Sequence, residues 1–351
     1  MSWEVLNVQK RIQYMDSLRA IAILGVLLLH VATPYVVLYG KINEIDWQIG
    51  IIYNALSRWC VPIFLMISGA LLLGRTEEPL GIFFKKRANK ILLPFIAWSI
   101  IYYAWATYMW SPGYSWKEFF IMFFNNQIYY HLWYFYALIG IYLLAPIVNI
   151  FVNHASKQMI GYVVVLWILF YGVLRYYSYI VSNEFTLFFP LSEYIGFFLL
   201  GYYLAAFELT KKWRIGIYVL GFIGAMETVL RTNVLTAEQG QFTSYAFSYS
   251  SPNVIAMSVA LFVFVKYWVN RKAARGTYRT SGIIKLIGQT SFGVYLVHAM
   301  ILDKVRPYFF EDDELFLKPI MAIPMQVFII LVLSTMIVWI IQKIPLVKRI
   351  V

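Results

Sequence analysis

The strongest constraint on this fold is a series of apolar runs, each about long enough to cross a lipid bilayer. A membrane-spanning helix needs about 20 apolar residues. Ten such runs cover residues 16–38, 51–73, 91–110, 132–152, 159–180, 190–207, 215–231, 250–269, 286–302 and 319–342. We therefore expect an all-helical integral membrane protein with about ten transmembrane helices, which form a single membrane domain over residues 1–351.

The amino-acid composition supports the same fold class. Apolar residues make up 61% of the chain and charged residues 13%, whereas soluble domains carry about 45–50% and about 25%. The net charge of +12 would suggest a nucleic-acid partner in a soluble protein. Here the basic residues lie in short loops between apolar runs, so we expect contacts with membrane lipids and none with nucleic acid.

The basic residues also predict the orientation of the chain. If the N-terminus is cytoplasmic, 20 of the 29 Lys and Arg residues, Lys266 among them, fall on the cytoplasmic side and 7 on the other side. Arg19 and Arg58 then lie inside spans. Because positive residues collect on the cytoplasmic side of membrane proteins, we expect both termini in the cytoplasm.

Charged residues inside apolar runs are functional candidates, because a charge in the hydrocarbon core costs about 2.5–3.5 kcal/mol on insertion scales. Arg19 and His30 share one stripe of the first predicted helix, separated by about 16 Å along its axis. Asp16 has the spacing to pair with Arg19. The structural alternative is that Arg19 extends back to the inner surface and that His30 bonds a neighbouring helix.

The second run combines Arg58, Pro62 and Ser68. Pro62 predicts a kink that frees a backbone carbonyl. Arg58 lies in the outer third of the run and needs a partner, unless its side chain extends to the outer surface. Ser68 precedes a glycine, so it belongs either to a site or to a close contact between helices.

Two further groups of residues lie near the ends of runs. Lys85, Lys86, Arg87 and Lys90 precede the third run; such a cluster can hold phosphate groups, or it can enforce topology and contact anionic lipids. His131, beside Trp133, and His298 lie near the outer ends of the fourth and ninth runs. Each histidine is a site candidate or a structural residue at the membrane interface.

Other signatures are missing from the sequence. There is no Gly-x-x-x-x-Gly-Lys-Ser/Thr phosphate loop, which argues against an ATP-driven pump. There is no His-Glu-x-x-His motif and Cys60 is the only cysteine, so we expect no metal site.

Four blocks, in this order, resemble the acyltransferase 3 family of membrane acyltransferases, and among its members those that O-acetylate enterobacterial common antigen. The blocks are Asp16–Ala22 followed by His30, Ser57-Arg58 with Val61–Gly69, Tyr130–Phe135 leading to Tyr142–Pro146, and Ser291–His298. The resemblance implies a multi-pass protein of the bacterial inner membrane with ten spans, cytoplasmic termini and an acyl-CoA donor. It also implies a catalytic His30 and an essential Arg19. The family's basic motif appears as Arg87–Lys90, with Lys at its last position where Arg is common.

The resemblance and the spacing of Arg19 and His30 lead to one mechanistic hypothesis. Acetyl-CoA would enter from the cytoplasm, and Arg19, Lys85, Lys86, Arg87 and Lys90 would hold its phosphates. The thioester would then lie near His30. His30 would act as general base on a sugar hydroxyl or accept the acyl group itself. Candidates for oxyanion stabilisation or for binding the sugar or glycan acceptor complete the site: Arg58, Ser68, His131, Trp133 and His298.

Three alternative functions remain open on the sequence alone. A transporter or flippase of a lipid-linked glycan also buries charges and breaks helices. A succinyltransferase of the same family would differ only in its donor. A sensor or scaffold for envelope enzymes would leave Arg19 and His30 without a purpose. The sequence leaves the oligomeric state and the identity of the acceptor open.

Overall fold

The computed structural model describes residues 3–110, 113, 115–174, 176–177, 193–276, 281–311, 314–345 and 347–351, with side chains from Gln13 onward. The α-helices are α1 (Trp3–Val36), α2 (Glu44–Ala55), α3 (Cys60–Leu72), α4 (Leu80–Arg87), α5 (Leu93–Trp110), α6 (Trp116–Phe124), α7 (Trp133–His154), α8 (Lys157–Trp167), α10 (Ile195–Ala206), α11 (Lys211–Gln239), α12 (Pro252–Ala274), α13 (Gly282–Val305) and α14 (Pro319–Ile341). The π-helical turns are η1 (Ala88–Leu92) and η2 (Ile168–Leu174), and the 3₁₀ turns are η3 (Tyr245–Phe247), η4 (Arg306–Tyr308) and η5 (Val347–Ile350).

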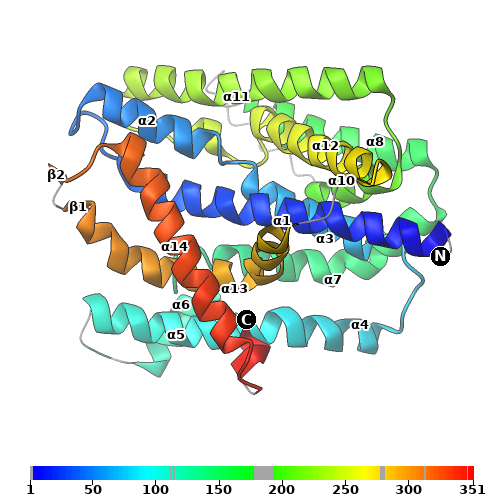
Figure 1. Cartoon of the computed structure of the whole chain (residues 1–351), viewed down its shortest axis with the longest axis horizontal. Coiled ribbons are helices and arrows are strands. Elements are labelled where there is room, and N and C mark those ends of the chain that lie inside the picture. Colours follow the sequence, from blue (N-terminus) through cyan, green and yellow to red (C-terminus); the bar gives the residue numbers. More distant parts are fainter. Residues whose placement is uncertain are drawn as a thin grey trace.

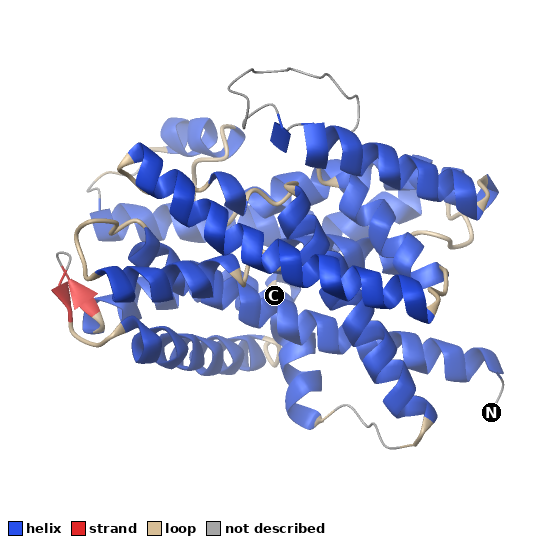
Figure 2. Ribbon diagram, turned by 90° about the horizontal axis from the view of Figure 1, so that it is seen from above, coloured by secondary structure: helices blue, strands red, loops and turns tan. Residues whose placement is uncertain are grey.

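The all-helical membrane fold predicted from the sequence is confirmed. Within the described residues, nine helical stretches are long and apolar enough to cross a membrane. Each overlaps one predicted run, and the remaining run corresponds to α10, which is apolar but has only 12 residues. Residues 175 and 178–192, which end the fifth predicted run and begin the sixth, lie outside the described residues. The strands found among those residues form one short antiparallel pair, β1 (Phe310–Glu311) and β2 (Glu314–Leu315) (Figure 2).

Helix α1 occupies the centre of the bundle. It packs against α2, α3, α12, α13 and α14, and it crosses the middle of the view in Figure 1, with α11 along one edge and α4 and α5 along the other. Its side chains are buried along most of its length, including Leu18, Ile23 and Ala32. A charged or polar residue on α1 is therefore held inside the protein, which suits a site rather than contact with lipid.

Two glycines fix the position of α3. A Cβ atom at Gly69 would lie 1.7 Å from the carbonyl oxygen of Phe198 on α10, and one at Gly201 would lie 2.0 Å from that of Met66. Because only hydrogen fits at both positions, the two backbones approach as closely as small-residue interfaces in membranes allow. Ser68, next to Gly69, is thereby held at a fixed depth.

The second predicted span differs from the expectation in one respect. The helix is interrupted at residues 56–59, between α2 and α3, and Arg58 lies in this interruption. Pro62 is in the first turn of α3, where a missing N–H costs no intrahelical bond. The kink predicted at Pro62 was therefore wrong, because the break precedes the proline.

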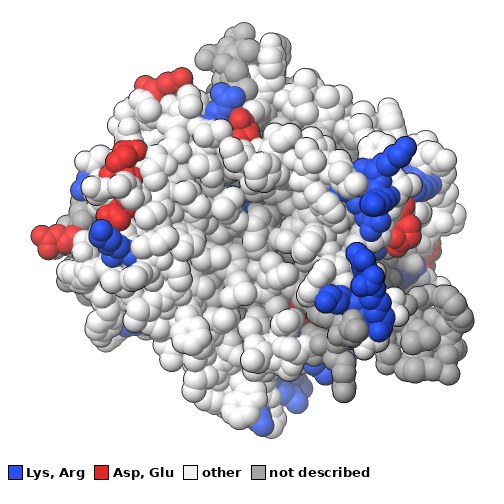
Figure 3. All heavy atoms as spheres, turned by 45° about the horizontal axis from the view of Figure 1, so that its top comes forward, with Lys and Arg blue, Asp and Glu red and all other residues white. Residues whose placement is uncertain are grey.

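The two ends of the bundle differ in charge. Residues 73–79 join α3 to α4 at one end of the bundle, which we call the basic end. The N-terminus lies at the same end (Figure 1). Lys and Arg side chains gather at one end of the face shown in Figure 3, and Asp and Glu side chains lie mostly at the other. The opposite end contains β1 and β2 (Figure 1).

Lys266 was counted with the loop cations of the sequence, but it is buried within α12. Its Nζ donates to the carbonyl oxygens of Leu204 at 2.9 Å, Phe207 at 3.3 Å and Ala205 at 3.4 Å, and it lies 3.1 Å from a carboxylate oxygen of Glu208. The ammonium group thus satisfies the last carbonyls of α10, which have no intrahelical partner.

Candidate functional site

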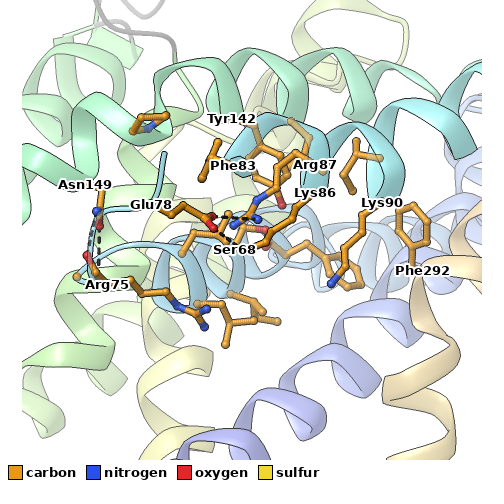
Figure 4. A pocket seen from close by; sticks show the side chains of 18 of the residues that line it. Ser68, Arg75, Glu78, Phe83, Lys86, Arg87, Lys90, Tyr142, Asn149 and Phe292 are labelled. Atoms are coloured by element: carbon orange, nitrogen blue, oxygen red, sulfur yellow. Dashed lines mark hydrogen bonds and ion pairs between the residues drawn. The ribbon is translucent and has the colours of Figure 1, made fainter. Parts of the chain in front are cut away.

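A cavity of about 1080 Å³ opens at the basic end between α1, α3, α4, η1, α7 and α13 (Figure 4). Its wall includes Arg19, Lys86, Arg87 and Lys90. Four of the five residues predicted to bind the donor therefore share one cavity, here called the basic cavity. Lys85, the fifth, is exposed and is not among the described residues that line it.

The cations predicted to bind the donor and found in the basic cavity come from three elements, α1, α4 and η1. Arg19 on α1 is held by Asp16, with Nη1 2.9 Å from Oδ1, as its spacing predicted. Lys86 and Arg87 end α4, and Lys90 lies in the π-helical turn η1. Pro94 follows this turn and lacks the N–H that an α-helix would use, which explains the local widening of the helix. Arg87, just before η1, and Lys90, within it, thus line the same cavity.

Glu78 is the residue of the basic cavity that the sequence analysis missed. Its carboxylate bonds the ammonium group of Lys86 and lies 3.7 Å from Nη1 of Arg87. The hydrogen bond from Lys86, with the charge of Arg87, holds the pKa of the Glu78 carboxyl below its ordinary value. A carboxylate shortly before a basic run was the available signal. In the structure it takes the place that a phosphate would take between these cations.

The connection that carries Glu78 is fixed at its other end. The backbone N–H of Arg75 donates to Oδ1 of Asn149 at 3.3 Å, and its carbonyl accepts from Asn149 and Asn153, each at 3.0 Å. These two amides on α7 keep the connection against the mouth of the basic cavity (Figure 4).

Ser68 lies on the wall of the basic cavity. Its hydroxyl donates to the carbonyl oxygen of Phe64 at 3.1 Å, and its side chain also hydrogen-bonds Tyr142. The inner wall is formed by Tyr134, Ser291, Phe292 and Tyr295. The structure therefore places Ser68 with the cations predicted to bind the donor and not with the predicted catalytic histidine.

Three histidines from distant parts of the chain meet beyond that inner wall. The ring of His298 on α13 lies 5.2 Å from that of His30 and 5.2 Å from that of His131. Nδ1 of His298 lies 2.6 Å from the carbonyl oxygen of Tyr295. Nε2 of His298 and both ring nitrogens of His131 are buried and have no hydrogen-bond partner in the part of the chain that the structure describes. We call His30, His131 and His298 the histidine cluster.

Tyr295 connects the basic cavity to the histidine cluster. It lines the cavity, its hydroxyl donates to the carbonyl oxygen of His131, and its ring centroid lies 5.7 Å from that of His298. The inner end of the cavity is thus one side chain away from the histidines. The signal in the sequence was the spacing of Tyr295 and His298, three residues apart on one helix face.

Arg58 and Trp133 lie on the other side of the histidine cluster. The guanidinium of Arg58 donates through Nε to Oδ1 of Asn54 at 2.8 Å and lies 4.2 Å from the centre of the Phe247 ring. Asn54 in turn donates to the carbonyl oxygen of Leu29, next to His30, at 3.1 Å. Trp133 stacks on Tyr249 at 5.7 Å. The sequence analysis missed Asn54, for which it offers no motif.

The described residues contain no group of three or more His, Cys, Asp or Glu side chains placed to hold a metal ion. The histidine cluster has ring contacts but not the geometry of a metal site. Acyl transfer between a thioester and a hydroxyl uses positioned bases and hydrogen-bond donors, which this site supplies.

Comparison with known proteins agrees with this arrangement. Residues 12–343 match the family model described as an acyltransferase domain, Acyl_transf_3. No curated protein and no solved structure matches the chain. The match covers nearly all of the chain, including the basic cavity and the histidine cluster, so the protein is a membrane acyltransferase and belongs to the acyltransferase 3 family.

Proposed function

We propose that the protein is an O-acetyltransferase of the bacterial inner membrane. It moves the acetyl group of cytoplasmic acetyl-CoA to a hydroxyl of a cell-envelope sugar or glycan. The observation that carries the proposal is the continuity of the site. The cations of the basic cavity lie at one end, and Tyr295 at the inner wall contacts the histidine cluster.

The basic cavity fits the donor in size and charge. Its volume of about 1080 Å³ is at the upper limit of ligand pockets, which hold roughly 300–1,000 Å³. The phosphates of CoA match the cations Arg19, Lys86, Arg87 and Lys90, since charge-assisted hydrogen bonds to phosphate are the strongest that side chains make. The apolar inner wall, with Phe292 and Leu138, suits the uncharged pantetheine arm and the acetyl group.

His30 is the proposed general base. It takes the proton of the acceptor hydroxyl while the hydroxyl oxygen attacks the thioester carbonyl carbon. The carbon–sulfur bond then breaks, and the CoA thiolate receives the proton from His30, so that the products are the acetyl ester and CoA thiol. Arg58 is favoured over Ser68 for oxyanion stabilisation because Asn54 links its guanidinium to the carbonyl oxygen of Leu29, next to His30, whereas Ser68 lines the basic cavity.

The test is the release of CoA thiol from acetyl-CoA by purified protein in nanodiscs, supplied with an envelope glycan extract. His30→Ala should abolish turnover, and Arg19→Ala should weaken donor binding. His154→Ala is the matched control, because His154 is exposed at the end of α7 and its Nδ1 lies 2.9 Å from the carbonyl oxygen of Ile150, one turn earlier in the same helix. It should turn over like the wild type.

Three results would contradict the proposal in different ways. If His30→Ala retains turnover, His30 is not a catalytic residue. If the protein strongly prefers succinyl-CoA, the transferred group is succinyl and not acetyl. If acid-quenched protein carries the acetyl label, the mechanism is an acyl-histidine route, in which His30 attacks the thioester first, and not general-base catalysis.

A further inference from the structure

A second pocket, of about 430 Å³, is lined by other residues than the basic cavity. Its wall combines Arg58, from the interruption between α2 and α3, with residues of η2, the two residues just before α10 and the connection from α11 to α12. The wall contains four serines between Ser244 and Ser251, five tyrosines, and one residue of each charge, Arg58 and Glu193. We call it the tyrosine–serine pocket.

The chemistry of this pocket suits a neutral polyhydroxylated ring. Tyrosine presents an apolar face and a polar tip, so it can pack on the C–H face of a sugar and hydrogen-bond its rim. Serine hydroxyls both donate and accept, as sugar hydroxyls do; Oγ of Ser248 lies 3.3 Å from that of Ser250. With one cation, the pocket is poorly suited to the several phosphates of CoA.

The pocket is tied to the proposed catalytic histidine through Arg58, a residue of its wall. Arg58 bonds Asn54, which donates to the carbonyl oxygen of Leu29 at 3.1 Å and to Oγ1 of Thr33 at 3.0 Å. These two acceptors lie on either side of His30 in α1. Arg58 also interacts electrostatically with His30. A ligand that displaces the guanidinium therefore acts on the helical turn that carries the base.

The same wall leads to a second histidine. Trp133 stacks on Tyr249 with ring centroids 5.7 Å apart and contacts Tyr194 at 5.5 Å. Both tyrosines line the pocket, and Trp133 follows His131 by two residues. The histidine cluster thus lies between the basic cavity and the tyrosine–serine pocket.

We propose that the tyrosine–serine pocket binds a sugar ring of the acceptor and presents its hydroxyl to His30 from the side opposite the donor. The assignment rests on the proposed acetyltransferase function and adds the place and chemistry of its second substrate. Donor and acceptor then enter from different ends of the bundle, and the acetyl group passes between them at the histidine cluster.

The test uses the variant Ser248→Cys, because its thiol can be blocked inside the pocket and then released again by reduction. Cys60, the only native cysteine, is fully buried, so a bulky methanethiosulfonate reagent should react only at position 248. Acetyl transfer from labelled acetyl-CoA to an envelope glycan extract is measured before blocking, after removal of excess reagent, and after reduction. The Kd of acetyl-CoA is measured in parallel. Gln241→Cys, on an exposed part of the same connection, is the matched control.

Blocking position 248 should lower transfer at least tenfold with an unchanged Kd of acetyl-CoA, and reduction should restore it. Because the same folded sample is measured in both states, a folding defect cannot imitate this result. Full transfer by the blocked protein overturns the pocket assignment but agrees with the proposed acetyltransferase function. If the unmodified wild type transfers no acetyl to the extract, the proposed function fails, and the assignment fails with it.

Discussion

The basic cavity and the tyrosine–serine pocket are both polar, yet they are built from opposite kinds of side chain. The first is large and lined by long cations, with Glu78 pairing two of them. The second is less than half its volume and is lined by rings and short hydroxyls with a single arginine. Long cations adapt to a flexible polyanion, whereas rings and serines provide a rigid surface of fixed shape. The contrast supports the proposed division between a polyanionic donor in the basic cavity and a neutral sugar in the tyrosine–serine pocket.

The largest expected effect concerns the histidine cluster, which belongs to neither region. His298→Ala removes the ring between His30 and His131. We expect kcat to fall by about a hundredfold, within the range for proton-transfer groups, while the Kd of acetyl-CoA stays within twofold. Steady-state kinetics and equilibrium binding on one preparation provide both numbers. A large loss of donor affinity with kcat preserved would assign His298 to the basic cavity instead.

The next effect separates neighbouring cations. Arg87→Ala removes a cavity residue and should raise the KM of acetyl-CoA by about tenfold or more, because hydrogen bonds to charged groups contribute about 1.5–3 kcal/mol. Lys85→Ala, two positions away and outside the cavity wall, should change the KM less than twofold. Equal losses in both variants would mean that net charge at the basic end, and not the cavity, binds the donor.

The smallest effect has the opposite sign. Glu78→Gln removes the carboxylate that competes with phosphates for Lys86 and Arg87, so the KM of acetyl-CoA should fall. Because exposed ion pairs contribute little, the change should stay within about fivefold. The depressed pKa of Glu78 keeps the carboxylate ionised at neutral pH, so the gain should be the same at pH 6 and pH 8. A KM that rises would show that Glu78 orders the cations instead of competing for them.

The sequence predicted the fold well because apolar runs report directly on the bilayer. Among the residues of the basic cavity it singled out Arg19, Lys86, Arg87 and Lys90, because they carry obvious charge. The residues that it missed act through tertiary contacts. Asn54 bonds Arg58, and no motif distinguishes it from an ordinary packing residue. Tyr295 lies between cavity and histidines; its spacing from His298 places both on one helix face but does not show which groups they contact. That His131 and His298 meet His30 depends on helix packing, which hydropathy does not determine.

The contact between Lys266 and α10 has a consequence for how the chain is made. Helix α10 has 12 residues, or about 18 Å of rise, and is too short to cross a hydrocarbon core of about 30 Å unaided. The ammonium group that satisfies its final carbonyls is synthesised 62 residues after Leu204. During translation, α10 therefore leaves the ribosome before its partner exists. Helix α10 can reach its final position in the membrane only after α12 has been synthesised, so this part of the bundle is completed late in biosynthesis.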